Sequence, residues 1–169
     1  MQTKNNIILI GMPASGKSTV GVILANILGM DFIDTDILIQ QREGARLNRI
    51  IEMSGIDEFL KKEEQALLSL DVSRTVIATG GSAVYSDVAM KHLADGSGVI
   101  YLKAQLEEIE KRLGDIKERG VVIKPGESLE EMYKTRAGLY EKYADITVDE
   151  DGRSIEDTVR RILDRLSAD

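Results

Sequence analysis

The chain alternates between short apolar runs and longer segments in which apolar residues recur every three or four positions. Runs rich in β-branched residues predict buried strands, and apolar positions at helical spacing predict helices packed on them. The predicted strands are 6–10, 31–33, 75–78, 98–102 and 145–148. The predicted helices cover 17–28, 37–70, 86–93, 105–113, a stretch that opens at the capping box Ser128–Glu131, and 154–166.

This regular alternation of strand and helix predicts an α/β fold with a doubly wound parallel sheet. With 169 residues, the chain has the size of a single domain, 1–169. Gly44 and Gly55 divide the helical stretch 37–70 into about three segments, which are well placed to cover a small ligand. Residues 114–127 have no sustained period and contain Arg119, so we expect a mobile loop there.

The turn between the first strand and the first helix carries the main chemical signal. Residues 11–18, Gly-Met-Pro-Ala-Ser-Gly-Lys-Ser, fit the P-loop pattern G-x-x-x-x-G-K-[ST]. Gly11 and Gly16 allow backbone N–H groups to point at phosphate oxygens, while Lys17 reaches the β- and γ-phosphates. Ser18 offers its hydroxyl to the Mg²⁺ that accompanies ATP. The motif therefore predicts binding of ATP and Mg²⁺.

Two carboxylates follow the second predicted strand. Asp34 and Asp36 stand at positions i and i+2, which share one side of an extended segment. Beside a P-loop, they suit a ligand of Mg²⁺-bound water and a base for a substrate hydroxyl. A solvated acidic turn or a helix N-cap is the alternative, because aspartate favours both.

A glycine pair ends the third predicted strand, in the sequence Thr79-Gly80-Gly81-Ser82. Open parallel sheets bind ligands at the carboxyl ends of their strands, and glycines there allow the backbone to approach a ligand closely. An ordinary strand-to-helix turn is the alternative interpretation.

The amino-acid composition limits which kinds of partner and compartment we expect for this protein. The net charge of −7 disfavours general affinity for nucleic acid or anionic membranes. The sequence has no cysteine, which excludes disulfides and thiolate metal sites. Its apolar runs are shorter than the ~20 residues of a membrane span. We therefore expect a cytoplasmic protein, without nucleic-acid or membrane partners, that acts as a monomer.

Together, these elements resemble the shikimate kinases over nearly the whole chain. The resemblance depends on the P-loop, on Phe32-Ile33-Asp34-Thr35-Asp36, on Phe59 with Glu63, on Thr79-Gly80-Gly81, and on Arg136-Ala137-Gly138-Leu139-Tyr140 with Ala144-Asp145. The resemblance implies a three-layer α/β/α P-loop kinase fold with a five-stranded parallel sheet. It further implies a helical substrate-binding region at 37–70 and a mobile lid at 112–126.

The resemblance also implies the reaction and the roles of single residues. ATP·Mg²⁺ would donate its γ-phosphate to the 3-hydroxyl of shikimate, with Lys17, Asp36 and Arg119 as catalytic residues. Asp34, with Ser18, would hold the metal. The acceptor would be bound by Asp36, Gly80, Gly81, Ser82 and Arg136. The implied ATP-binding residues are Gly11, Ala14, Ser15, Gly16, Lys17, Ser18, Thr19, Arg112 against the adenine, and Arg119 of the lid.

Three positions depart from the family pattern. Leu60 stands where the family has an arginine that grips the shikimate carboxylate, and Ser82 replaces a third glycine. The lid sequence Arg-Pro-Leu-Leu is Arg119-Gly120-Val121-Val122 here. An apolar wall at Leu60 suits an acceptor with less negative charge. A kinase of the same fold for another hydroxylated metabolite, or a nucleotide-binding regulator without transfer activity, are therefore the alternatives.

Overall fold

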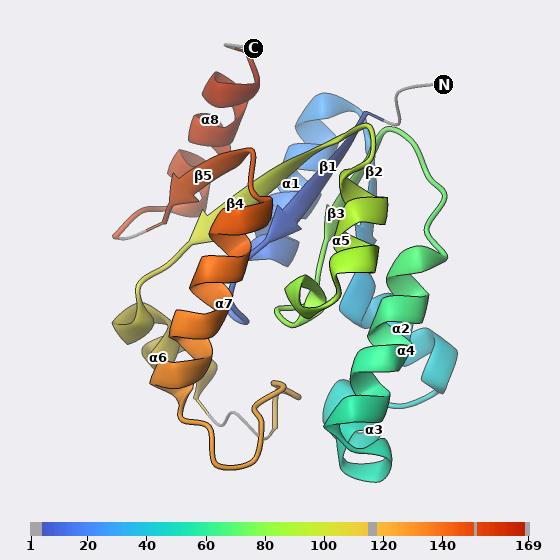
Figure 1. Cartoon of the computed structure of the whole chain (residues 1–169). Helices are drawn as coiled ribbons and strands as arrows, with labels where there is room; N and C mark the ends of the chain where they lie inside the picture. Colours follow the sequence, from blue (N-terminus) through green and yellow to red (C-terminus); the bar gives the residue numbers. More distant parts are fainter. Residues whose placement is uncertain (1–4, 115–117, 151, 168–169) are drawn as a thin grey trace.

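The structure is a computed structural model that describes residues 5–114, 118–150 and 152–167. Five strands alternate with helices along these residues (Figure 1). In chain order the elements are β1 (Asn6–Ile10), α1 (Lys17–Leu28), β2 (Asp31–Asp34), α2 (Thr35–Glu43), α3 (Leu47–Ser54), α4 (Ile56–Leu68), β3 (Thr75–Ala78), the 3₁₀ turn η1 (Ala83–Tyr85), α5 (Asp87–Ala94), β4 (Ser97–Lys103), α6 (Leu106–Leu113), α7 (Leu129–Tyr143), β5 (Ile146–Asp149) and α8 (Ile155–Leu166). No helix within these residues is long and apolar enough to cross a membrane.

The strands form one parallel sheet in the order β2-β3-β1-β4-β5. β1 lies at its centre, where Ile8 pairs with Ile77 of β3 on one side and with Val99 of β4 on the other. From β1 the chain passes to β2 and β3, which lie on one side of β1, and then crosses to β4 on its other side. In open parallel sheets, ligands bind where the strand order switches in this way. The P-loop follows β1 directly, so it occupies this position.

Helices cover both faces of the sheet, as expected for a three-layer α/β/α fold (Figure 1). Successive side chains of β1 point to opposite faces, so Ile7 and Leu9 join a core with α1 and α8. Ile8 and Ile10 join the opposite core, which includes residues of α5, α6 and α7. All five residues of β1 are buried. Burial on both faces explains why the strand is a continuous apolar run rather than an alternating one.

Helices α2, α3 and α4 form the predicted helical segment, and the chain breaks at the two expected glycines. Gly44 and Gly55 have φ of +66° and +81°, values that L-residues with a side chain rarely adopt. A small separate core contains Ile39 of α2, Ile50 of α3, and Phe59 and Ala66 of α4. Val122, from the segment between α6 and α7, is buried in the same core. The helical segment therefore packs against the stretch that we expected to be a loop.

The packing of α1 on the sheet predicts a stability effect at Gly21. A Cβ there would lie 2.6 Å from Cε2 of Phe32 and 3.2 Å from Cδ1 of Leu9, so a larger side chain must displace an aromatic ring. We expect Gly21→Val to lower the free energy of unfolding by about 1–3 kcal/mol, as overpacked cores do. The measurement is urea unfolding followed by circular dichroism. Gly138→Val in α7 is the matched control, because nothing lies within 4 Å of a Cβ there. Equal destabilisation by both variants would contradict the prediction.

Candidate functional site

The P-loop has the backbone that its glycines permit. Gly11 has φ of +150°, and a Cβ on it would lie 2.6 Å from the carbonyl oxygen of Leu102. Gly16 has φ of +82° and is the N-cap of α1. The free N–H groups of the first turn of α1 therefore face the loop, and a helix N-terminus of this kind attracts anions.

Lys17 is buried at the centre of this loop. Its Nζ donates hydrogen bonds to the carbonyl oxygens of Gly11 and Met12, at 2.9 and 2.7 Å, and to Oγ of Ser15 at 3.3 Å. Burial lowers the pKa of Lys17 to about 8, against the opposing effect of nearby carboxylates, first of all Asp36. The ammonium is thus held inside the turn of the loop, where phosphate oxygens would lie.

The two aspartates do not share an extended segment, so that expectation was wrong. β2 ends at Asp34, and Asp36 lies in the first turn of α2. The reason is that Oδ1 of Asp34 caps α2 by accepting from the N–H groups of Asp36, at 2.9 Å, and Ile37, at 3.2 Å. Oδ2 of Asp34 accepts a hydrogen bond from Ser18 Oγ at 2.5 Å. Both interpretations of Asp34 therefore apply, because it caps a helix and also contacts the P-loop.

Asp36 and the P-loop face one cavity of about 420 Å³. Burial, and then the nearby carboxylate of Asp34, raises the pKa of Asp36 to about 6, while Lys17 acts in the opposite direction. The residues that line this cavity are Pro13, Ala14, Gly16, Lys17, Ser18, Thr19, Asp36, Leu47, Phe59, Thr79, Gly80, Gly81, Ser82, Arg119, Gly120, Val121, Val122 and Arg136. One cavity therefore brings together most of the predicted site residues.

Gly80 and Gly81 form part of the wall of this cavity, and side chains from four elements lie close to them. A Cβ on Gly80 would lie 2.6 Å from both Asp36 Oδ1 and Glu63 Oε1. A Cβ on Gly81 would lie 2.7 Å from Cδ of Pro13 and 3.1 Å from Nη1 of Arg136. The glycine pair is therefore required for close packing as well as for access to a ligand.

Arg136 is completely buried in α7. Its Nε donates to the hydroxyl of Tyr85 at 3.2 Å, and its Nη2 donates to the carbonyl oxygen of Val122. The guanidinium also lies over the Tyr85 ring, 5.1 Å from the ring centroid. Nη1 is buried and has no hydrogen-bond partner among the described residues. A buried cation with a free donor at a cavity wall suits a carboxylate ligand.

Two of the three departures from the family pattern, Leu60 and Ser82, line the same small cavity. Leu60 borders a second cavity, of about 150 Å³, together with Glu63, Ser82 and Tyr85. Ser82 Oγ donates a 2.6 Å hydrogen bond to Oε2 of the buried Glu63. Sequence reasoning gave no role to Glu63, although Phe59 with Glu63 is one of the elements on which the family resemblance depends. The available signal was its spacing: Glu63 comes four residues after Phe59 and so lies on the same helix face.

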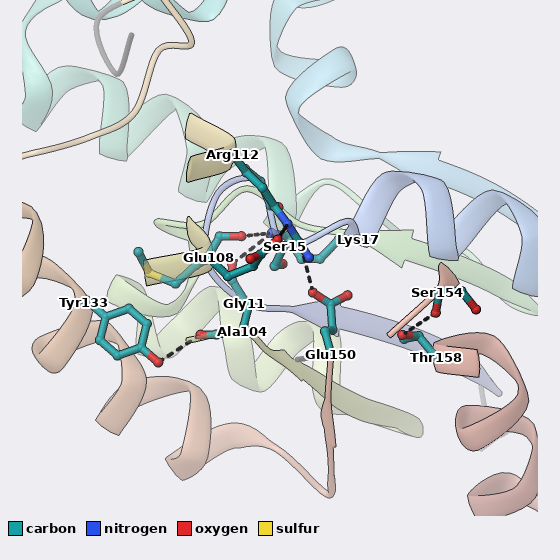
Figure 2. Close-up of polar contacts among 12 residues, drawn as sticks. Gly11, Ser15, Lys17, Ala104, Glu108, Arg112, Tyr133, Glu150, Ser154 and Thr158 are labelled. Carbon is teal, nitrogen blue, oxygen red and sulfur yellow. Dashed lines mark hydrogen bonds and ion pairs between the residues drawn. The ribbon is translucent and has the colours of Figure 1, made fainter. Parts of the chain in front are cut away.

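Arg112 lies against the P-loop, beside Glu150, an acidic residue that sequence reasoning missed (Figure 2). It extends from α6, where Nε donates to Glu108 at 2.9 Å, and Nη1 donates to the carbonyl oxygen of Ala14 at 3.3 Å. The same Nη1 is 3.4 Å from Oε2 of Glu150, a buried residue that directly follows β5. Two carboxylates thus hold the guanidinium against the P-loop. No local pattern distinguishes Glu150 from surface acidic residues.

Arg119 is exposed on the segment that joins α6 to α7, and it lines the 420 Å³ cavity. Gly120, the next residue, has φ of +68° and packs on α3, where a Cβ would lie 2.7 Å from the backbone nitrogen of Asn48. The described part of the predicted lid, 112–126, therefore crosses from the P-loop side to the helical segment. Residues 115–117 of that range lie outside the described residues.

Comparisons with a family model, with curated relatives and with solved structures all point to the same family. A family model described as "Shikimate kinase" matches residues 13–167. Curated shikimate kinases from Pasteurella multocida and Haemophilus influenzae are 40% and 38% identical over 97% of this chain, and the match covers 96% and 93% of those proteins. A solved shikimate kinase from Acinetobacter baumannii, in complex with shikimate, superposes with a TM-score of 0.87 at 31% identity, over 99% of this chain and 95% of the other.

More distant structures share the fold alone. A gluconokinase from Sinorhizobium meliloti superposes with a TM-score of 0.56 at 18% identity, over 99% of this chain and 94% of the other. The family match over residues 13–167, by contrast, includes most of the P-loop, the glycine pair and the buried arginine of the cavity. On these grounds, the chain belongs to the shikimate kinase family.

Proposed function

We propose that this protein transfers the γ-phosphate of ATP to the 3-hydroxyl of shikimate, with Mg²⁺ as the metal. The observation that carries this proposal is that Arg136, whose buried Nη1 has no hydrogen-bond partner among the described residues, lines the same cavity as Lys17 and Asp36. A phosphate-binding loop, a carboxylate and a carboxylate-binding guanidinium therefore meet in a space suited to one small anionic acceptor.

The nucleotide side requires positive charge and oxygen ligands. Lys17 and the first N–H groups of α1 would bind the phosphate oxygens, and Arg112 would lie against the adenine. The Ser18 hydroxyl and the Asp34 carboxylate are hard oxygen donors of the kind that Mg²⁺ prefers. The 2.5 Å contact between them holds Asp34 at the end of the P-loop. When bound, the metal neutralises charge on the transferred phosphoryl group. These residues position the nucleotide for an in-line transfer.

The acceptor side requires orientation and a site for a proton. Arg136 would bind the substrate carboxylate, and this contact fixes how the ring lies in the cavity. Asp36 would then orient the acceptor hydroxyl and accept its proton as the phosphoryl group arrives. Arg119 would come from the segment 112–126 to share the charge on the phosphoryl oxygens, while that lid excludes water.

The decisive experiment is an ADP-release assay with shikimate and a panel of other hydroxy acids and sugars. We expect turnover with shikimate that requires Mg²⁺. Turnover with another compound, beside none with shikimate, would contradict the proposed acceptor. No turnover with any acceptor would favour a nucleotide-binding regulator.

Lys17→Met tests the phosphate side. The substitution removes the charge and keeps the length of the side chain, so we expect turnover to fall by at least ~10²-fold, because the lost interaction stabilises developing charge. Steady-state kinetics measures the effect, and circular dichroism verifies that the fold is retained. Near-normal turnover in a folded variant would exclude this role for Lys17.

Asp36→Asn tests the acceptor side with a nearly isosteric change. If Asp36 orients and deprotonates the hydroxyl, kcat should fall sharply while the affinity for ATP stays within a few-fold. Nucleotide titration calorimetry and steady-state kinetics measure the two quantities separately. The opposite result, weak ATP binding with kcat retained, would place Asp36 in a metal-binding or structural role.

Leu60→Arg separates shikimate from a less anionic acceptor. A second charge-assisted hydrogen bond to the carboxylate should lower KM for shikimate by about tenfold, and kcat should stay constant because ground state and transition state gain equally. For an acceptor without that carboxylate, the added guanidinium stays unpaired and KM should rise. KM values for shikimate and for the best other compound of the panel decide between the two.

A further inference from the structure

Glu63 has a buried carboxylate oxygen that the proposed reaction does not use. The residue lies on α4 and is 2% exposed. Oε2 accepts the hydrogen bond from Ser82 Oγ at 2.6 Å, whereas Oε1 has no partner within the part of the chain that the structure describes. Leaving an ionised carboxylate oxygen buried without a partner is costly. Oε1 is therefore a place for a proton.

Two charged side chains, one acidic and one basic, approach Glu63 from two other helices. From α2, Asp36 Oδ1 comes as close as Glu63 Oε1 to the Cβ position of Gly80, at 2.6 Å. From α7, the unpartnered Nη1 of Arg136 lies at the neighbouring Gly81. Burial raises the pKa of Glu63 to about 7; the hydrogen bond from Ser82 and the charge of Arg136 act against this rise, and Asp36 adds to it.

Other titratable groups on and around α4 have partners of their own. On α4 itself, Lys62 pairs with Glu43 at 2.6 Å. On the adjoining α5, Asp87 pairs with Lys91 at 2.6 Å. His92, also on α5, lies with Nε2 2.8 Å from the carbonyl oxygen of Leu70. On η1, the Tyr85 hydroxyl accepts from Arg136. Arg136 and Asp36 therefore dominate the electrostatic surroundings of Glu63.

An anionic acceptor changes this balance. A carboxylate bound to Arg136 adds negative charge close to Glu63, which favours the neutral form of the Glu63 carboxyl. By reciprocity, an ionised Glu63 competes with the acceptor for the field of Arg136 and weakens its binding. The hydrogen bond from Ser82 favours the ionised form of Glu63, so Ser82 lowers the pH at which Glu63 takes up the proton.

We propose that Glu63 determines the affinity for the anionic acceptor by taking up a proton when the acceptor binds, with Ser82 as the residue that positions its carboxyl. This inference rests on the proposed function, because it takes a carboxylate-bearing acceptor at Arg136 as given. The direction of the pH dependence follows from this: the affinity for the acceptor is high below the pKa of Glu63 and falls as the pH rises through it. Ser82, one of the family departures, thus acquires a specific task.

Isothermal titration calorimetry of shikimate, without nucleotide, tests the proposal. Between pH 6 and 8.5 we expect Kd to rise about tenfold, the ratio that corresponds to a pKa change of one unit. Near pH 7, titrations in two buffers of different ionisation enthalpy should reveal uptake of a fraction of a proton. A Kd independent of pH, with no proton exchanged, would overturn the proposal without any variant.

Three variants assign the proton to Glu63. Glu63→Gln keeps the shape but cannot titrate, so Kd should stay near the low-pH value of the wild type and the proton uptake should vanish. Ser82→Ala removes a donor that favours the ionised form, so the rise in Kd should move to higher pH. Glu64→Gln is the matched control: Glu64 accepts from Ser86 Oγ at 2.5 Å on the same helix and should leave the profile unchanged.

The outcomes separate this inference from the proposed function. Proton uptake that persists in Glu63→Gln would assign the proton to another group and overturn the inference. Efficient phosphorylation of shikimate with a pH-independent Kd would do the same, while the proposed function stands. If shikimate neither binds nor reacts at any pH, the proposed function fails and this inference fails with it.

Discussion

The site depends on the absence of side chains at two adjacent positions, Gly80 and Gly81. Asp36 and Glu63 close on the first, and Pro13 and Arg136 close on the second, each to about 3 Å or less from where a Cβ would lie. The pair therefore lets α2, α4, α7 and the P-loop converge at the carboxyl end of β3. The hydroxyl of Tyr140 secures the turn by donating to the carbonyl oxygen of Gly81 at 2.6 Å. Because these contacts join the nucleotide side to the acceptor side, a Cβ at either glycine would disturb both.

Sequence reasoning succeeded where local physics decides the structure. The strands, the breaks at Gly44 and Gly55 and the capping box at Ser128 follow from periodicity and backbone preference, and all are present. The P-loop could be predicted because its spacing alone encodes its backbone. The aspartate pair failed at the same local level: a helix N-cap and a strand end compete for Asp34, and the cap ended the strand before Asp36.

The contacts that hold the rest of the site together could not be predicted, because they join distant segments of the chain. Arg136 donates to the carbonyl oxygen of Val122, and no side-chain pattern reveals a backbone acceptor. Glu63 was visible as part of a motif, but its hydrogen bond from Ser82 joins two elements that are 19 positions apart in the sequence. Glu150 is one of 29 acidic residues, and only the tertiary fold brings it to Arg112, 38 positions away in the sequence.

Asp34 uses both oxygens at once, one for the first turn of α2 and one for Ser18. A rotation of this carboxylate toward a cation near Ser18 cannot leave the cap unchanged, and the helix that it caps carries Asp36. If Asp34 holds the metal and Asp36 the acceptor, as proposed, the two substrates are linked through one side chain. Under the proposed function, binding of the nucleotide with its metal would therefore alter the turn that carries Asp36, and we expect the affinities for the two ligands to depend on each other.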